Sequence, residues 1–335
     1  MPAWTPACLN QVYSSGMAGM SGSIRIGIVL SSGGVRGVYA HTGFMQAIKN
    51  LGIRIDASAG CSAGALVGGF IASGTALESW TRTLAGIDSR AFWTPDSISR
   101  FIWEMAAHKG RGYTGLSDTQ AALQFARENL SVNSFQECRY PFHVLAVNLG
   151  TGKKMVFSEG ELAPRMTASA AMPILYEPVM IDGEYYCDGA LIDFAPTDAI
   201  CCRHQLDVVI VHHVSQHFGI QGNIDAALQD SWAMLEVINR LVFREKPWYL
   251  SDQPLTLHRC PCGCGAVVIA IVPALPYMRW PITKGGEGVQ QSAREQAEKL
   301  LQPYMNKLMH DPRNELPLSG ESVGQPASGC GHNHD

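Results

Sequence analysis

Apolar positions in the first part of the chain alternate between the spacing of strands and the spacing of helices. Residues 24–31 are a continuous, β-branched apolar run, which predicts a buried strand. Residues 37–49 carry apolar side chains at helical spacing and predict a helix. A short strand over 53–57 and a helix of small apolar residues over 63–73 are expected next. This order predicts an α/β fold with a central, mostly parallel sheet.

The rest of the chain continues the pattern of strands and helices. Further strands are predicted at 140–149 and 208–214, and a hairpin at 255–259 and 266–272. Helices are predicted over most of 75–135, and over 223–243 and 288–309. The polar ends, rich in Gly and Ser, are expected to be disordered. We therefore divide the chain into a lead-in (1–23), a main domain (24–214), an extension packed on that domain (215–309) and a tail (310–335).

Composition narrows the classes of function. The chain has 335 residues, of which 46% are hydrophobic and 16% charged, so it can bury a large core. A formal net charge of -4 gives no electrostatic reason to expect nucleic acid as a partner. No apolar run is long enough to span a bilayer, and the start lacks the pattern of a secretory signal. The cysteines are therefore expected to be reduced, which predicts a cytoplasmic location.

The segment Gly60-Cys61-Ser62-Ala63-Gly64 matches G-x-S-x-G between a predicted strand and a predicted helix. In that setting a sharp turn lifts the serine hydroxyl clear of the sheet, and the flanking glycines let backbones pass closely. The helix that begins there directs its N–H groups toward developing negative charge. An ordinary glycine-rich turn has the same short pattern, but the strand before it and the apolar helix after it favour Ser62 as a nucleophile.

A second glycine-rich segment, Ser32-Gly33-Gly34-Val35-Arg36-Gly37, lies between the first predicted strand and its helix. Consecutive glycines at a helix N-terminus expose backbone N–H groups, which suits stabilisation of a tetrahedral oxyanion. With Asp56 about twenty residues later, the same outline also describes a dinucleotide site. Two features weigh against that alternative: Ser32 stands at the first glycine position, and the strand with Asp56 runs directly into the serine motif.

A serine nucleophile needs a group that accepts its proton. The segment Asp188-Gly189-Ala190 places an aspartate after an apolar stretch and before a glycine turn, where it is poised to face a cleft. A histidine base is the alternative, because the chain order Ser, Asp, His is that of α/β-hydrolases. The candidates are His212, His213 and His217. Only two predicted strands precede Ser62, which is too few for that fold.

Three motifs in this order resemble those of the patatin-like phospholipases. They are SGGVRG at 32–37, GCSAG at 60–64 and DGA at 188–190, the last within a longer similar stretch over 168–196. The resemblance implies a three-layer α/β/α fold, a catalytic dyad of Ser62 and Asp188, and an oxyanion loop at 33–37. It also implies hydrolysis of acyl lipids without a metal. Two residues, Ser32 and Phe194, depart from the family pattern.

A dyad without histidine requires an aspartate that is a stronger base than usual. A free carboxylate, with a pKa of about 3.9, accepts a serine proton poorly. Apolar neighbours are expected to raise the pKa of Asp188 by desolvation, and the sequence offers Tyr186, Leu191 and Ile192.

The sequence therefore predicts a serine hydrolase that cleaves ester bonds of acyl lipids. Peripheral contact with a membrane is expected because the substrate lies there. An acyltransferase that uses the same acyl-enzyme, and a non-catalytic nucleotide- or lipid-binding module, are the alternatives. An aromatic-rich segment around Pro95 is expected to form a core or cap helix rather than a lid.

Cysteine and histidine also gather in two places outside these motifs. One group is His258, Cys260, Cys262 and Cys264, and the other is Cys330, His332 and His334. Thiolate and imidazole bind zinc well, but C-x-C-x-C is not the usual spacing of a zinc site. We therefore predict no metal and no cofactor.

Overall fold

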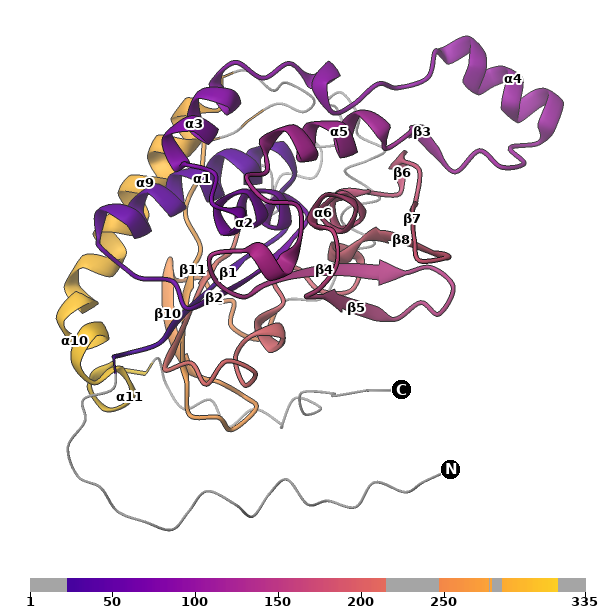
Figure 1. The fold of residues 1–335 in the computed structure, drawn as a ribbon. Helices are drawn as coiled ribbons and strands as arrows, with labels where there is room; N and C mark the ends of the chain where they lie inside the picture. The colour runs from indigo at the N-terminus through magenta and orange to yellow at the C-terminus, as the bar shows by residue number, and fades with distance from the viewer. Residues whose placement is uncertain (1–22, 215–246, 277, 279–284, 319–335) are drawn as a thin grey trace, which may run out of the picture.

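The computed structural model describes residues 23–214, 247–276, 278 and 285–318. Within this part of the chain the main sheet has nine strands in the order β10-β11-β9-β1-β2-β4-β8-β7, with β5 also paired to β4 (Figure 1). Its strands are β1 (Ile26–Leu30), β2 (Ala57–Cys61), β4 (Phe142–Asn148), β5 (Lys154–Phe157), β7 (Val179–Ile181), β8 (Glu184–Asp188), β9 (Val208–His212), β10 (Leu255–Arg259) and β11 (Val267–Ile271). A separate small sheet pairs β3 (Gly115–Ser117) with β6 (Ile174–Tyr176).

Helices connect and cover these strands. The α-helices are α1 (Gly34–Asn50), α2 (Ala63–Ser73), α3 (Leu77–Ala85), α4 (Ile98–His108), α5 (Gln120–Asn129), α6 (Leu162–Ala170), α9 (Glu287–Leu301), α10 (Met305–His310) and α11 (Pro312–Glu315). Short 3-10 turns are η1 (Ser89–Ala91), η2 (Phe135–Glu137), η3 (Gly189–Leu191), η4 (Thr197–Ala199) and η5 (Gln302–Tyr304).

The central strands are apolar because both of their faces are covered. β11, β9, β1, β2 and β4 lie side by side and parallel, and every residue in them is buried. A parallel strand buried on both faces has no solvent side that would call for polar residues. Antiparallel strands lie at both ends of this region: β10 pairs with β11 at one end, and β5 and β8 both pair with β4 at the other, with β7 next to β8. The predicted α/β fold is confirmed, and its sheet is mixed, with the parallel part in the middle.

The two faces of the sheet are covered differently. Alternate residues of β1, including Ile28 and Leu30, share one apolar cluster with side chains of α1, α2, α3 and α9. Val29 points to the other face, where a second cluster contains residues from 195–206 and from the loop after β10. Among the described residues, this second cluster takes its covering layer from η4 and loops rather than from α-helices.

The register along β4 determines where the serine and aspartate motifs meet. β2 runs parallel to β4, and its last residue, Cys61, lies opposite Leu145. β8 runs antiparallel to β4, and its last residue, Asp188, lies opposite Ala146. β5 takes one side of β4 over residues 144–147, so β2 and β8 must share the other side. The two strands therefore meet end to end, and the residue after Cys61 comes next to Asp188.

Several boundaries differ from the sequence predictions. The strand predicted at 53–57 is instead β2 at Ala57–Cys61, because small residues without strong β propensity pair there with β1 and β4. Helix α1 begins at Gly34, earlier than predicted. The described chain continues through α10 and α11, past residue 310 where the tail was predicted to start. The helix predicted over 223–243 lies outside the described residues.

Helices α1 and α9 pack closely against each other at Gly43. A methyl group at Gly43 would collide with the backbone carbonyl of Gln290 and would lie 3.2 Å from the backbone nitrogen of Arg294. Gly288, on the exposed side of α9, has open space where a methyl group would go. The two glycines thus differ in what a side chain would meet.

We expect Gly43→Ala to lower the free energy of unfolding by about 1–3 kcal/mol, because overpacking would push the two helices apart. Gly288→Ala is the matched control and is expected to be neutral, or to stabilise by up to about 1 kcal/mol because Ala is the better helix former. Urea denaturation followed by circular dichroism measures both. Equal stability of the two variants would contradict the close packing at Gly43.

Candidate active site

Ser62 occupies the tight turn between β2 and α2, with φ of 53° and ψ of -118°. Residues other than glycine rarely adopt a positive φ, and such strain is typical of functional turns. The two glycines of the motif allow backbones to pass closely. A methyl group at Gly60 would collide with the carbonyl of Gly64, and one at Gly64 would collide with the carbonyl of Leu30. The spacing of the motif therefore follows from backbone contacts on both sides of the serine.

The hydroxyl of Ser62 donates a hydrogen bond to Asp188 Oδ2 over 2.8 Å. Asp188 Oδ1 accepts a second bond from the backbone N–H of Ala190 over 2.9 Å, and the thiol of Cys61 lies 3.9 Å from it. Ser62 is 6% exposed and Asp188 is 1% exposed. The structure thus brings together the two candidate residues, which lie 126 positions apart in the sequence.

Burial changes the acid–base behaviour of Asp188. Desolvation raises the pKa of its carboxyl group to about 7, against the lowering effect of its hydrogen bonds. The apolar cluster at this point consists of Cys61, Leu145 and Ala190, whereas Ile192, which the sequence analysis expected to desolvate Asp188, is exposed. A carboxylate with a pKa near neutrality is better matched to accept a serine proton than an ordinary one.

Ser169 on α6 fixes the backbone of the turn at Ser62. No motif in the sequence marks this residue. Its buried hydroxyl accepts a hydrogen bond from the backbone N–H of Ser62 over 2.9 Å and donates one to the carbonyl of Leu145 over 2.5 Å. The turn is thereby tied to β4 through one side chain. The only sequence signal was its position inside the family-like stretch 168–196, because a serine among small residues has no diagnostic spacing.

The glycine-rich loop leads into α1 next to the serine motif. Gly34 has φ of +56°, and a methyl group at Gly37 would lie 3.0 Å from Cβ of Ala63. The first N–H groups of a helix have no partner within it, so those near Gly34 and Val35 are candidates to bind an oxyanion. Arg36 is buried and donates to the carbonyl of Leu275 over 3.1 Å, which holds the loop against the segment after β11.

Two of the candidate histidines are engaged elsewhere. His212 Nδ1 lies 2.8 Å from Nδ1 of His41, whose Nε2 lies 2.7 Å from the carbonyl of Ser31. A carbonyl only accepts, so His41 donates from Nε2 and accepts from His212. Burial lowers the pKa of both rings, and they form a neutral pair beneath the loop. His213 Nδ1 lies 3.1 Å from the hydroxyl of Tyr249. His217 lies outside the described residues.

Asp56, on which the dinucleotide alternative depends, is engaged with the sheet. It accepts a hydrogen bond from the backbone N–H of Ile26 over 2.8 Å and pairs with Arg54 over 3.0 Å. These contacts secure the beginning of β1. The carboxylate thus has a structural use, and the geometry gives no support to ribose binding.

The family model for patatin-like phospholipases matches residues 28–200. This span is just over half of the chain and contains the glycine loop, the serine motif and the aspartate motif. The chain therefore belongs to the patatin-like phospholipase family.

Curated relatives agree with this assignment. An uncharacterised NTE family protein of Mycobacterium tuberculosis is 31% identical over 176 residues, which are 52% of this chain and 45% of that protein. Lysophospholipase NTE1 of Cryptococcus neoformans is 28% identical over 187 residues, which are 56% of this chain and 11% of that protein. The chain thus spans less than half the length of these relatives.

Likeness to solved structures is weaker. Human GIVD cytosolic phospholipase A2 matches with a TM-score of 0.45 and 11% identity, over 85% of this chain and 59% of that one. VipD from Legionella pneumophila matches with a TM-score of 0.42 and 14% identity, over 84% of this chain and 67% of that one. In the described part of the chain, no helix is both long enough and apolar enough to cross a bilayer.

Removing the buried charge should stabilise the fold at alkaline pH. We expect Asp188→Asn to raise the free energy of unfolding near pH 8 by up to about 4 kcal/mol, because each unit by which burial raises the pKa corresponds to about 1.4 kcal/mol. As the pH falls through 7, folded wild type takes up a proton and is relieved of the buried charge. The gain should therefore shrink as the pH approaches 4, near the ordinary pKa of an aspartate.

Urea denaturation at a series of pH values measures this difference. Asp182→Asn is the control, since the Asp182 side chain is 84% exposed and an amide oxygen can still accept a hydrogen bond from Arg165, so stability should change little. A gain from Asp188→Asn that is the same at every pH would show that burial does not raise the pKa of Asp188.

Proposed function

We propose that this chain is a lipid acyl hydrolase that cleaves carboxylic ester bonds through an acyl-enzyme on Ser62. The observation that carries the proposal is the buried 2.8 Å hydrogen bond from the Ser62 hydroxyl to Asp188. A serine becomes a nucleophile when an adjacent base takes its proton, and a carboxylate with a pKa of about 7 is such a base at neutral pH. The strained turn would present the Ser62 hydroxyl to the ester, and the glycine loop would stabilise the oxyanion.

Acylation begins with attack of Ser62 Oγ on the ester carbonyl carbon, while the hydroxyl proton passes to Asp188 Oδ2. The carbonyl oxygen becomes an oxyanion, which takes hydrogen bonds from backbone N–H groups of the 33–37 loop. When the tetrahedral intermediate collapses, the bond to the alcohol breaks. The departing alcohol oxygen takes the proton from Asp188, and the acyl group stays on Ser62.

Deacylation repeats these steps with water as the nucleophile. Asp188 takes a proton from water as its oxygen attacks the acyl carbon, and the same loop stabilises the second oxyanion. Collapse expels Ser62 Oγ, which recovers the proton from Asp188. The net reaction consumes one ester and one water and releases a fatty acid and an alcohol.

The partly buried ammonium group of Lys154 holds the segment that follows the Asp188-Gly189-Ala190 motif. Lys154 on β5 pairs with Asp193 and Asp198 over 2.7 Å each, and its side chain is only 25% exposed. Burial opposes the charge of Lys154, but the two carboxylates outweigh it and raise the pKa of the amine. These contacts fix the chain just beyond Asp188 and so support the position of the base.

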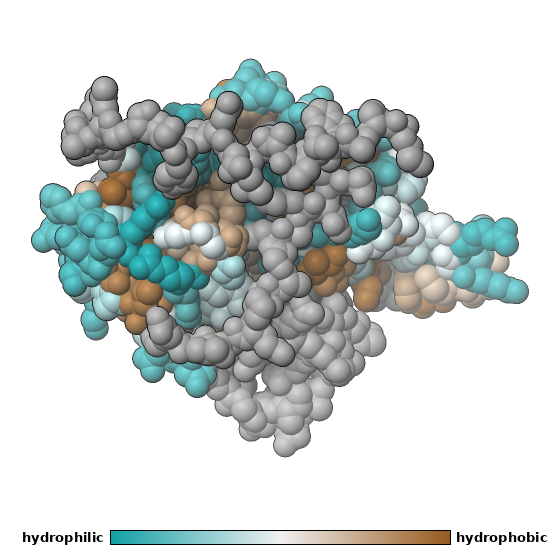
Figure 2. Space-filling model, turned by 90° about the horizontal axis from the view of Figure 1, so that it is seen from below, coloured by the Kyte–Doolittle hydropathy of each residue, from teal (hydrophilic) through white to brown (hydrophobic). Residues whose placement is uncertain are grey.

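An exposed apolar arm offers a contact with lipid. Helix α4 projects from the rest of the molecule (Figures 1 and 2). Its Ile102 is 59% exposed and Trp103 is 64% exposed, with Phe101 and Met105 also exposed. The prediction of a core or cap helix in this segment was wrong. A helix with an exposed aromatic and aliphatic side can lie in the headgroup region of a membrane, and we propose this role for α4.

Replacing either member of the pair should abolish hydrolysis. We expect Ser62→Ala and Asp188→Asn to lower kcat/KM on chromogenic acyl esters by at least about a thousandfold, because the nucleophile or its base is lost. Ser58→Ala is the matched control and should retain activity, because Ser58 is a buried serine on β2, the strand that leads to Ser62. Full activity of Asp188→Asn would assign the base to another residue. An ester product formed on addition of an alcohol would identify acyl transfer instead of hydrolysis.

The pH dependence of the wild-type enzyme should reflect the carboxyl group of Asp188. Only its deprotonated form can take the serine proton, so kcat/KM should rise with pH and level off above about 7. Initial rates on a soluble ester across this range measure the profile. A profile that is flat down to pH values of about 5 would mean that the base has an ordinary carboxyl pKa.

Removing the exposed apolar side chains of α4 should weaken binding to lipid surfaces and leave hydrolysis of soluble esters unchanged. We expect the double variant Ile102→Ser/Trp103→Ser to bind phosphatidylcholine vesicles at least about tenfold more weakly, because it loses apolar area that enters the membrane. Its rate on a soluble short-chain ester should be unchanged. Met309→Ser, at an exposed apolar residue on α10, is the control. Unchanged vesicle binding by the double variant would exclude α4 as the lipid contact.

A further inference from the structure

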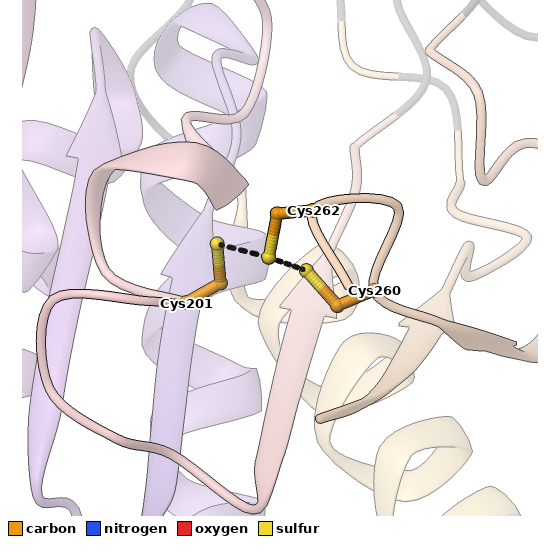
Figure 3. Close-up of side chains that lie close together, drawn as sticks. All are labelled: Cys201, Cys260 and Cys262. Carbon is orange, nitrogen blue, oxygen red and sulfur yellow. Dashed lines mark hydrogen bonds between the residues drawn. The ribbon is translucent and has the colours of Figure 1, made fainter. Parts of the chain in front are cut away.

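Five cysteines from two separate segments converge on the sheet face opposite α1. Cys201 and Cys202 follow η4, whereas Cys260, Cys262 and Cys264 lie in the loop between β10 and β11 (Figure 3). They form two overlapping groups, in each of which all sulfur atoms lie within 4.8 Å of one another. The groups are Cys201, Cys260 and Cys262, and Cys202, Cys262 and Cys264. A recognisable spacing marks only the second segment in the sequence, because the spacing of Cys201 and Cys202 gives no sign of this contact.

The sulfur atoms lie close enough together to share one small ion. Cys262 Sγ lies 3.8 Å from that of Cys201, 3.1 Å from that of Cys260 and 2.7 Å from that of Cys202. In a tetrahedral site with zinc–sulfur bonds of about 2.3 Å, sulfur atoms are separated by about 3.8 Å. All five side chains are free thiols. The Cys201–Cys262 separation therefore equals that of a zinc site, whereas the sulfur atoms of Cys260 and Cys202 lie closer to Cys262 and would move away from it by roughly 1 Å on binding.

The loop between β10 and β11 is built to direct its cysteines to one place. Its ends are joined by a bond from the N–H of Cys260 to the carbonyl of Ala266 over 2.9 Å. Gly263 and Gly265 have φ of +78° and +79°, a conformation that favours glycine. Alternation of cysteine with proline or glycine therefore gives a tight loop, and its three thiols gather against Cys201 and Cys202.

The surroundings suit a soft metal ion. The ligand atoms are all sulfur, which selects zinc and similar ions over magnesium or calcium. Cys201 and Cys260 are buried within the apolar cluster on this face. Arg259 donates to the carbonyls of Gly265 and Arg313 beside the loop. A zinc ion with four thiolates carries two negative charges, and the positive charge of Arg259 beside the loop would partly offset them.

We propose that this cluster binds one zinc ion, with Cys201, Cys260 and Cys262 as ligands and Cys202 or Cys264 as the fourth. Each ligating thiol releases its proton to solvent as its bond to zinc forms, so no oxidant or reductant is required. A site closed by four thiolates is structural rather than catalytic. All five cysteines lie beyond residue 200, where the family match ends, so this ion fastens the loop between β10 and β11 to the segment that directly follows the matched region. The site is independent of the proposed hydrolase activity.

The first experiment uses wild-type full-length protein, loaded with zinc under reducing conditions and then dialysed. We expect about one zinc per chain, with a shell of sulfur at about 2.3 Å in the X-ray absorption spectrum. Cobalt(II) in place of zinc should give an intense sulfur-to-cobalt charge-transfer band. These measurements need no variant, so they stand even if a substitution prevents folding.

Variants then assign the ligands. Cys260→Ser and Cys262→Ser should each weaken zinc binding at least about tenfold in a competition with a chromogenic chelator. Cys138→Ser, at a half-buried cysteine outside the cluster, is the matched control and should bind normally. A triple variant of the tail, Cys330→Ser/His332→Ala/His334→Ala, should also keep its zinc.

Four results would overturn the proposal. They are wild-type protein that holds no stoichiometric zinc after loading, a shell of nitrogen and oxygen instead of sulfur, zinc lost only from the tail variant, and a disulfide within the cluster in place of bound metal. Iron with acid-labile sulfide in the purified protein would likewise replace the assignment to zinc.

Discussion

A carboxylate buried among apolar groups is the constraint on which the active site depends. Asp188 is surrounded by hydrogen-bond donors and apolar side chains, and desolvation is the largest influence on its pKa. The resulting charge is destabilised, and under the proposed mechanism this is what would let the carboxylate take a proton from Ser62. The burial that costs stability and the basicity that permits reaction therefore have one physical cause. A solvated aspartate at this position would be more stable and a weaker base.

Strand β4 organises everything that keeps this carboxylate in place. It pairs with β2 and β8 on one side and with β5 on the other, and its Leu145 carbonyl receives the hydroxyl of Ser169. Through Ser169 the backbone of the Ser62 turn is anchored to the same strand. Lys154 on β5 then holds the chain that follows Asp188. Ser62, Asp188 and the segment after Asp188 are thus all positioned relative to one strand.

Local chemistry made part of this structure predictable. Helix α2 has the predicted bounds because Ser62 and Gly74 delimit it in sequence, and the serine and aspartate motifs carry their own turn residues. Strand β2 was misplaced because its small residues form a strand only through pairing with their neighbours. Ser169 and the approach of Cys201 to the loop after β10 depend on long-range contacts, which leave no periodic trace in a single sequence. The exposure of α4 was not predicted for the same reason. Apolar spacing alone does not distinguish a packed helix from one that projects from the molecule.

The end-to-end meeting of β2 and β8 has a consequence for folding. Ser62 and Asp188 are 126 residues apart, whereas β1 and β2 are neighbours along the chain and can pair early. Contacts between distant segments require closure of a long loop and tend to form late. A chain with its parallel strands assembled but β8 out of register would contain both Ser62 and Asp188 and still lack the hydrogen bond between them on which the proposed activity depends. Recovery of activity during refolding would therefore report the antiparallel register on β4, not collapse of the core.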